Sequence, residues 1–446
     1  MRKQEKRALI CLLIAAVLCI GVVVFGVRFV RDGGRWASFY GNTQIYTDGI
    51  INRGIVMDRN DELLIQCARE GVTYSEDSTI RKATIHAVGD PAGNIASGAI
   101  SIYKSQLIGY DILNGTYDTD QSGKKIQLTI DANANVAAYN ALAGRTGAVG
   151  VFNWKTGEIV CMVSTPSFDP YGYLPDDEDS SYYFNNFLDG ALTPGSTFKL
   201  VTSAAVIDTL SDRGKFKFDC DGTNEFSGVD FTDIKTHGEV DFRDALAQSC
   251  NGAFGALTRK VGAAKMKEYV RKAGLVDPVE FDGIRTAGGK FKFPSDDDVT
   301  LSWAGIGQAD DLVNPCALMI YMGAIANGGE AVQPTLIKSA TFIKEITGGK
   351  SLGRYLDEDT ANELRNMMKY NVQSNYGEEN FPGLDIYAKS GTAETGSWNP
   401  DAWFVGFTDG ANDPYAFVVW VKDGGYGSEV AAPIARTVLE TLEADE

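Results

Sequence analysis

The sequence predicts an α+β protein that carries a single membrane-spanning helix. Three observations predict it: one apolar run of membrane-spanning length, two sets of β-branched runs joined by tight turns, and helical periodicity between those sets. We expect a tail over residues 1–7, a membrane helix over 8–27, a small β-rich pedestal or dimerisation-like domain over 28–125 and a main domain over 126–446. The main domain should contain a five-stranded antiparallel sheet flanked by helices, and an all-helical subdomain.

The composition is that of a globular protein with an acidic surface. The 446 residues are 44% hydrophobic and 22% charged, and 41 Lys plus Arg against 59 Asp plus Glu give a formal charge of −18. This is the wrong sign for a protein that binds phosphates through its cations, so we expect no nucleic-acid partner. Because the chain has only two histidines, His86 and His237, a multi-histidine metal site is excluded.

The seven cysteines predict free, mostly buried thiols. They include no Cys-x-x-Cys pair and no spacing typical of zinc or of a disulfide framework, and Cys161 and Cys316 adjoin apolar runs. We therefore expect neither a metal ion nor a cofactor.

Residues Ala8 to Val27 are uncharged and almost wholly apolar. A helix of this length, at about 1.5 Å rise per residue, crosses a hydrocarbon core of about 30 Å. A slight excess of basic residues before the run favours a cytoplasmic amino terminus, with the rest of the chain outside the bacterial cell membrane. Two alternatives are weaker. Gly26-Val27-Arg28 is a poor signal-peptide cleavage site, and Leu18 is large where a lipoprotein anchored through Cys19 needs a small residue.

The region that follows alternates short apolar runs with turn signals such as Asp58-Arg59-Asn60 and Asn114-Gly115. This pattern predicts small β-rich or mixed structure. Since it contains no catalytic motif, we interpret it as a spacer, pedestal or partner-docking module.

The main domain is predicted from strands at both of its ends. A helical pattern ends near Ala143, and the runs 147–152 and 159–163 then flank a Gly-containing turn, which predicts a hairpin. Three further strands are expected at 386–393, 402–407 and 415–421, followed by a helix over about 428–444. Between these sets lies a mostly helical insert over about 195–370, with amphipathic patterns at 242–248, 252–261 and 263–273.

The segment from Thr193 to Lys199 predicts a helix start, with Thr193 as N-cap and Pro194 at the first helical position. Ser196 then lies in the first turn, where unpaired N–H groups and the helix dipole stabilise a developing anion. Lys199 follows three residues later on the same face, and it can take the serine proton once burial lowers its pKa. We predict Ser196 as a nucleophile and Lys199 as its base.

Two further motifs accompany this pair. Ser249-Cys250-Asn251 falls between helical patterns, so Ser249 can relay a proton and Asn251 can hold a substrate amide from an interhelical loop. Lys389-Ser390-Gly391-Thr392 lies on a strand pattern, and a glycine in mid-strand indicates close approach of a backbone or ligand. A substrate added along this strand would place its carboxylate at Ser390 and Thr392, in the field of Lys389.

Ser-x-x-Lys, Ser-x-Asn and Lys-[Ser/Thr]-Gly in this order are the signature of the penicillin-recognising serine acyltransferases. Each triplet alone is common, but here the three occur in order at spacings of 53 and 140 residues. The chain resembles the class B penicillin-binding proteins, which are membrane-anchored peptidoglycan D,D-transpeptidases.

The resemblance extends from about residue 53 to the end. The matching segments are Arg53–Asn60, Thr156–Ser164 with Pro166 and Asp169-Pro170, His237-Gly238, Gly305–Gln308, Ala326–Gly329 and Trp403–Phe407. The third motif departs from the commoner form by carrying Ser390 in place of Thr, which retains the hydroxyl. A single histidine beside a glycine, as at His237, is more typical of a structural residue than of a base.

The resemblance implies an acyl-enzyme mechanism. Ser196 would attack the carbonyl between the two terminal D-alanines of a stem peptide, with Lys199 as base, and β-lactams would be trapped on the same serine. Ser249 and Lys389 would assist proton transfer to the leaving amine. The acyl group would then pass to an amine of a neighbouring strand.

The resemblance also implies how the substrate is held. Ser390, Gly391 and Thr392 would bind the terminal carboxylate, and the backbone N–H groups of Ser196 and Thr392 would form the oxyanion hole. A polytopic glycosyltransferase of the SEDS family is the implied partner.

Other functions use the same motifs. A D,D-carboxypeptidase would transfer the same acyl group to water, and an idle scaffold would activate the glycosyltransferase without catalysis; both stay open. A class A enzyme needs a glycosyltransferase domain for which about 100 residues are too few. A β-lactamase needs a deacylating glutamate, and a β-lactam sensor needs a signalling region inside the cell. The anchor and Arg53–Asn60 favour the transpeptidase.

Overall fold

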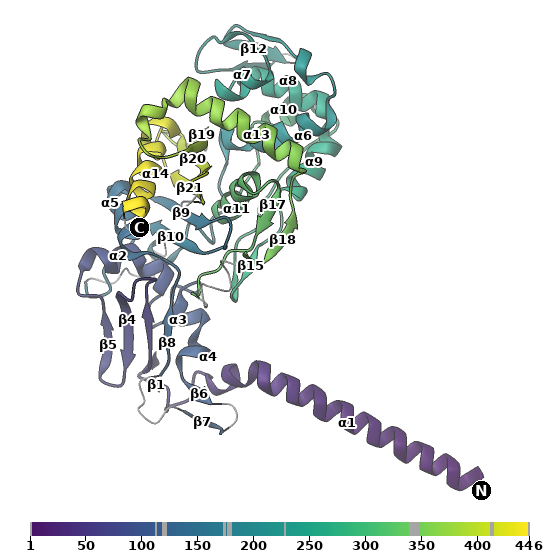
Figure 1. Ribbon diagram of the computed structural model, residues 1–446, viewed down its shortest axis with the longest axis vertical. Helices are drawn as coiled ribbons and strands as arrows, with labels where there is room; N and C mark the ends of the chain where they lie inside the picture. The colour runs from purple at the N-terminus through teal and green to yellow at the C-terminus, as the bar shows by residue number, and fades with distance from the viewer. Residues whose placement is uncertain are drawn as a thin grey trace.

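The computed structural model has three consecutive parts: a long amino-terminal helix, a β-rich region and a larger α+β body (Figure 1). It describes residues 2–111, 114–117, 123–172, 175, 181–226, 229–338, 348–410 and 414–444. The predicted α+β class is therefore confirmed.

Helix α1, Arg2–Ala37, projects away from the body (Figure 1). It contains the predicted span 8–27 and is long and apolar enough to cross a membrane, which fits a membrane anchor. The helix runs ten residues beyond Val27. Its last turns pack on α4, Lys104–Leu107, where Gly34 lies against Ser105.

The region after α1 is built on a four-stranded sheet in the order β5-β4-β3-β8. The strands are β3 Gly54–Met57, β4 Leu63–Ala68, β5 Gly71–Tyr74 and β8 Lys125–Gln127. Around them lie α2 Ser78–Val88, α3 Ala99–Ile102 and the hairpins of β1 Tyr46–Thr47 with β2 Ile50–Ile51 and β6 Tyr110–Asp111 with β7 Thr116–Tyr117. Because β8 pairs in parallel with β3, the predicted boundary at residue 125 falls inside a strand of this sheet.

The body is organised around the predicted five-stranded antiparallel sheet, in the order β10-β9-β21-β20-β19. Its strands are β9 Gly147–Asn153, β10 Ile159–Thr165, β19 Ile386–Ala393, β20 Asp401–Thr408 and β21 Tyr415–Val421. Helices α5, Ala132–Leu142, and α14, Gly427–Ala444, cover one face, and α11, Pro315–Ala326, covers the other. Since both faces are covered, the central strands read as nearly continuous apolar runs.

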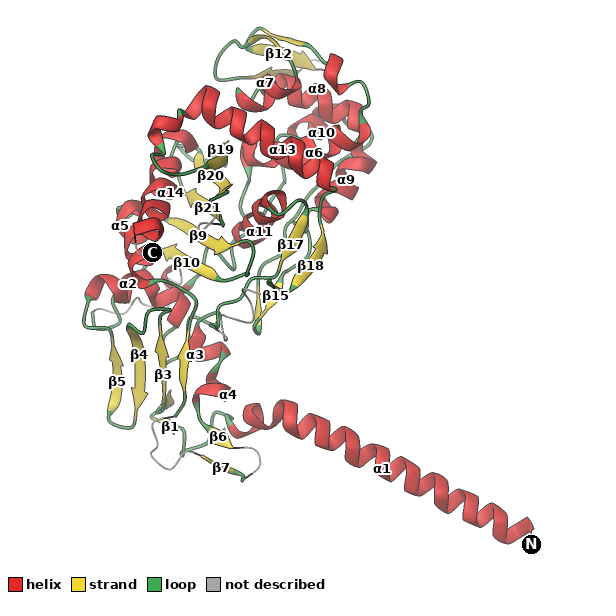
Figure 2. Ribbon diagram, viewed as in Figure 1, coloured by secondary structure: helices red, strands yellow, loops and turns green. Residues whose placement is uncertain are grey.

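The helical insert packs beside the β19 edge of this sheet (Figure 2). Its helices are α6 Lys199–Thr209, α7 Phe242–Ala247, α8 Asn251–Val261, α9 Ala263–Lys272, α10 Asp298–Ala304 and α13 Glu358–Asn371. The three amphipathic patterns of the sequence correspond to α7, α8 and α9, as predicted.

The expectation of an all-helical subdomain needs correction, because short hairpins interrupt the insert. They pair β11 Phe218–Cys220 with β14 Gly238–Val240, β12 Thr223–Phe226 with β13 Val229–Thr232, β15 Glu280–Phe281 with β16 Ile284–Arg285, and β17 Glu330–Val332 with β18 Ser351–Arg354. Strands of two to four residues are too short to show a period of two, so the sequence does not separate them from loops.

Asp311 is a fully buried carboxyl group. The backbone N–H of Lys292 donates to its Oδ1 at 3.2 Å, whereas Oδ2 has no partner among the described residues. Burial raises the pKa of Asp311 to about 8. The folded chain therefore binds a proton that the unfolded chain, with an ordinary pKa of about 3.9, has released, and this term lowers stability as the pH rises from about 4 to about 8.

We predict that Asp311→Asn removes this pH dependence. The variant should match the wild type in urea unfolding at pH 5, where Asp311 is protonated, and should unfold at a higher urea concentration than the wild type at pH 8. Asp310→Asn, which changes the exposed neighbour, is the matched control. Equal losses of stability in wild type and Asp311→Asn between pH 5 and 8 would contradict the assignment.

Candidate active site

Ser196 lies in a single 3₁₀ turn, Gly195–Phe198, that leads directly into α6. The predicted cap is wrong, because the residue before the turn is Pro194 and no side chain caps the turn. The carbonyl of Thr193 instead accepts a hydrogen bond from the indole of Trp403 on β20, at 2.9 Å. The helix start is therefore held by the sheet rather than by its own cap.

Gly195 fixes this turn against two neighbouring backbones. Its φ is +55°, and its N–H donates to the carbonyl of Gly307 at 2.9 Å. A Cβ at this position would lie 2.6 Å from the carbonyl oxygen of Thr392. Only glycine accommodates both the left-handed backbone and this approach, which places the turn of Ser196 on the edge of β19.

Lys199 is fully buried at the first position of α6. Its Nζ donates to the carbonyl of Ser249 at 2.5 Å, to the Ser249 Oγ at 3.2 Å and to the Asn251 Oδ1 at 2.8 Å. Burial lowers the pKa of Lys199 to about 8, although the charges of Asp233 and Cys250 act in the opposite direction. A lysine with this pKa is partly neutral near physiological pH, as a general base must be.

Ser249 and Asn251 lie between α7 and α8, in the interhelical position that the sequence predicts. Ser249 has a φ of +58°, and Cys250 is the N-cap of α8. The side-chain amide of Asn251 donates to the carbonyl of Thr232 at 2.8 Å, while its oxygen accepts from Lys199. Asn251 therefore links the base to the strand β13.

Lys389 contacts Ser249 from strand β19 of the sheet. It is 1% exposed, and its Nζ donates to the Ser249 Oγ at 3.0 Å and to the carbonyl of Ser390 at 2.8 Å. Burial, and then the charge of Lys199, lower the pKa of Lys389 well below its ordinary value. A serine hydroxyl can accept two hydrogen bonds, so Ser249 joins the two lysines.

Ser390 and Thr392 line a cavity of 260 Å³ together with Ser196, Ser249 and Asn251. Gly391 lies outside this lining. A Cβ added to Gly391 would be 2.8 Å from Cγ2 of Thr197 and 3.1 Å from the carbonyl oxygen of Pro194. The glycine therefore allows the nucleophile turn to pack closely against β19.

Tyr376 was not identified from the sequence. It ends a π-helical turn, Val372–Tyr376, that continues α13, and it lines the cavity. Its hydroxyl donates to the Ser390 Oγ at 2.8 Å and accepts from the Ser390 N–H at 2.8 Å and from the amide of Asn371 at 3.0 Å. The only signal was the unusual Asn- and Glu-rich composition from Tyr370 to Phe381.

The three motifs thus converge from α6, the α7–α8 loop and β19 on one cavity. Among the described residues the hydroxyl of Ser196 makes no hydrogen bond, whereas Lys199 is bonded to the second motif. Catalytic hydrogen bonds are often long or unformed until the substrate is bound, so this geometry is compatible with Ser196 as the nucleophile. The chemistry it supports is attack by the half-buried hydroxyl of Ser196, with the buried amine of Lys199 three residues away on the same chain segment.

Comparison with known proteins agrees with this site. A model of the penicillin binding protein transpeptidase domain matches residues 147–440. The peptidoglycan D,D-transpeptidase PbpA of Mycobacterium tuberculosis is 28% identical over 361 residues, which cover 72% of this chain and 73% of that protein. The peptidoglycan D,D-transpeptidase MrdA of Acinetobacter baumannii is 28% identical over 374 residues, covering 71% and 54% of the two chains.

Solved structures have the same fold. The ceftriaxone acyl-enzyme complex of penicillin-binding protein A from M. tuberculosis has a TM-score of 0.75 at 24% identity, covering 87% of this chain and 98% of that one. The Pseudomonas aeruginosa PBP2 complex with WCK 5153 has a TM-score of 0.71 at 24% identity, covering 89% and 97%. The chain belongs to the penicillin-binding protein transpeptidase family.

Proposed function

We propose that this protein is a peptidoglycan D,D-transpeptidase that works through a serine acyl-enzyme and is inhibited by β-lactams. The observation that carries the proposal is the convergence of Lys199 and Lys389 on Ser249, which lines the same cavity as Ser196. The names of the PbpA and MrdA relatives support the same substrate class.

In the acylation step the Ser196 oxygen attacks the carbonyl carbon between the two terminal D-alanines, and its proton passes to Lys199. The carbon–nitrogen bond then breaks, and the leaving amine takes a proton through Ser249, which hydrogen-bonds both lysines. The backbone N–H groups of Ser196 and Thr392 stabilise the oxyanion, a contribution of about 3 kcal/mol per donor. The position of Gly195 against Thr392 supports this pairing.

In the second step an amine of a neighbouring stem peptide attacks the ester carbonyl and releases Ser196. Ser390 and Thr392 hold the terminal carboxylate of the donor peptide, in the field of Lys389. Water as the acceptor instead would make the protein a D,D-carboxypeptidase. The anchor α1 supports the transpeptidase, whose acceptor is part of the wall that surrounds the membrane.

We also propose that the amino terminus is cytoplasmic and that the domains after α1 are extracytoplasmic, since their substrate lies there and basic residues precede the apolar run. A SEDS-family glycosyltransferase would pair with α1 and the β-rich region after it, as the family resemblance implies. Co-purification of such a partner with the full chain, and its loss when the sequence of α1 is replaced, would test this.

The nucleophile is tested by intact mass. The full chain in detergent, mixed with benzylpenicillin, should gain one covalent adduct, and Ser196→Ala should gain none because the attacking oxygen is gone. Thr197→Ser, which keeps a hydroxyl one residue away, is the matched control and should still be acylated. A folded wild-type protein that gains no adduct would favour the idle scaffold.

The base is tested by the pH dependence of acylation. Lys199 acts in its neutral form, and its pKa is about 8, so the second-order rate constant should rise with pH and level off above about pH 8. At pH 6 it should be about a hundredfold below the plateau. The measurement is stopped-flow acylation by a fluorescent penicillin, corrected for the hydrolysis of the free drug. A profile that is flat from pH 6 to 9 would remove Lys199 from this role.

The orientation of Ser390 is tested by Tyr376→Phe, which keeps the ring beside Phe404 and removes the hydroxyl. One neutral hydrogen bond contributes about 1 kcal/mol, so we expect β-lactam binding before acylation to weaken about threefold to tenfold. The maximal acylation rate should change less. Tyr370→Phe is the control. It removes from α13 a hydroxyl that donates to Asp244 of α7. Equal effects of the two variants on binding would contradict a positioning role for Tyr376.

A further inference from the structure

The cavity of Ser196 continues along β19 beyond the residues that the mechanism above uses. Ser390, Thr392 and Glu394 all line it, and Glu394 directly follows the last residue of the strand. Residues two apart in extended backbone point to the same side, so Glu394 continues the row of the two hydroxyl groups that hold the donor carboxylate. Glu394 is exposed, and nothing in the mechanism above gives it a role.

The backbone of Glu394 is held by Gln308, another residue of the cavity lining. With its amide in the orientation that satisfies both atoms, the Gln308 side chain donates to the carbonyl of Glu394 at 3.2 Å and accepts from its N–H at 3.1 Å. A peptide that lies along β19 at Thr392 therefore finds the backbone two residues further on already occupied. What Glu394 offers such a peptide is its carboxylate, which has no hydrogen bond or ion pair with any residue that the structure describes.

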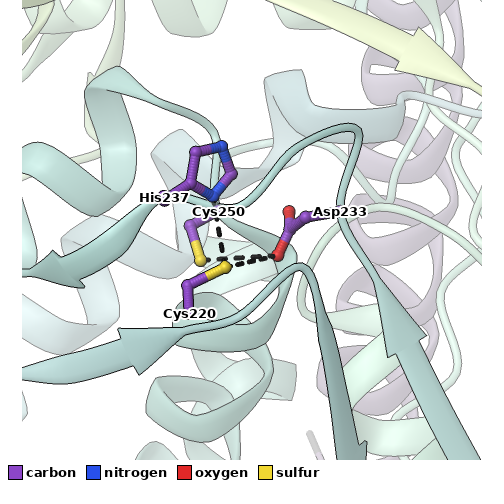
Figure 3. A group of neighbouring side chains, drawn as sticks. All are labelled: Cys220, Asp233, His237 and Cys250. Carbon is purple, nitrogen blue, oxygen red and sulfur yellow. Dashed lines mark hydrogen bonds between the residues drawn. The ribbon is translucent and has the colours of Figure 1, made fainter.

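The other carboxylate of the cavity lining, Asp233, is occupied within the protein. Its Oδ1 accepts from the N–H of Asn251 at 2.6 Å, and its Oδ2 accepts from the N–H of Gly252 at 3.3 Å. The thiols of Cys220 and Cys250 also donate to the Oδ2, at 3.4 and 3.5 Å (Figure 3). Of the two carboxylates that line the cavity, Glu394 is therefore the one available to a substrate.

The charges of the cavity follow the direction of β19. The Nζ of Lys389 donates to the carbonyl of Ser390 at 2.8 Å. Glu394 lies four residues beyond Ser390, about 13 Å along an extended chain at about 3.3 Å per residue. A donor peptide with its terminal carboxylate at Ser390 and its reacting carbonyl at Thr392 runs from the cationic end of this row toward the anionic end.

The proposed function indicates what the donor carries there. The acceptor of the second step is an amine of a neighbouring stem peptide, and donor and acceptor are copies of the same kind of stem, so the donor also carries this amine. The two D-alanines have no side-chain amine, which leaves the residue before them as the first that can carry it. Two extended residues cover about 7 Å, and a side chain such as that of lysine, with its four-carbon stem, can cover the remaining distance to Glu394.

We propose that Glu394 binds the side-chain ammonium of the residue that precedes the two D-alanines in the donor stem peptide, an inference that rests on the proposed function. The site would then select a diamino acid at this position. Glu394 contacts the substrate away from the reacting atoms, so it determines specificity and takes no part in proton transfer. Because it is exposed, water screens the ion pair and the preference for a cationic donor is modest.

The first test compares two penicillins that differ by one amino group. The ε-aminocaproyl derivative carries an ammonium on the chain length of lysine, and the caproyl derivative lacks it. Competition with a fluorescent penicillin, with the full chain in detergent at pH 7, gives the second-order rate constant of acylation for each. Glu394→Gln should lower the ratio of the aminocaproyl to the caproyl rate constant about twofold to fivefold. Glu429→Gln, which removes the same charge beside Ser428 but outside the cavity lining, is the matched control and should keep the wild-type ratio.

The second test varies the charge and its screening. Glu394→Lys, which reverses the charge, should lower the ratio below that of Glu394→Gln. In the wild type the ratio should fall toward that of Glu394→Gln as the salt concentration rises from about 0.05 to about 0.5 M, since salt screens an exposed pair. The salt series on the wild type does not depend on the folding of any variant.

Equal ratios in the wild type and Glu394→Gln, or a wild-type ratio that does not change with salt, would overturn the inference alone. A folded wild type that neither penicillin acylates would overturn the proposed function, and this inference with it. The two failures are therefore distinguished by whether the covalent adduct forms.

Discussion

The site depends on the burial of two lysine amines around one serine hydroxyl. Lysine is rarely buried, because removing an ammonium ion from water is costly unless it is paired. Here Lys199 and Lys389 are almost inaccessible, and both donate to Ser249. Burial lowers the pKa of both lysines, and the charge of Lys199 lowers that of Lys389 further. The architecture around them serves to exclude water and to hold this arrangement.

Three elements that are distant in sequence must meet for this burial to occur, and glycine makes two of the contacts possible. Gly195 brings the nucleophile turn against Thr392, and Gly391 leaves room for Thr197. The five-stranded sheet, packed on both faces, provides the fixed edge. Because α13 and the nucleophile turn pack against β19, the reactive groups lie where the insert meets the edge of the sheet.

Much of the fold could be predicted because its signals are local. The central strands carry long β-branched runs, α1 has one uniform apolar run, and the three motifs are contiguous in sequence. The start of the nucleophile helix was mispredicted, since Thr193 has the chemistry of a cap but is held by Trp403, over 200 residues away. Tyr376 was missed for the same reason: its contacts with Ser390 and Asn371 are tertiary.

The continuity of α1 affects how the active site is oriented relative to the membrane. Its 36 residues span about 54 Å at about 1.5 Å each, well beyond a hydrocarbon core of about 30 Å. The final turns pack on α4 without an intervening linker. Because α1 contacts α4 directly, a rotation or tilt of α1 would also move α4 and the β-rich region that contains it. A protein that binds α1 inside the membrane would therefore influence the direction in which the cavity of Ser196 faces and its distance from the lipid.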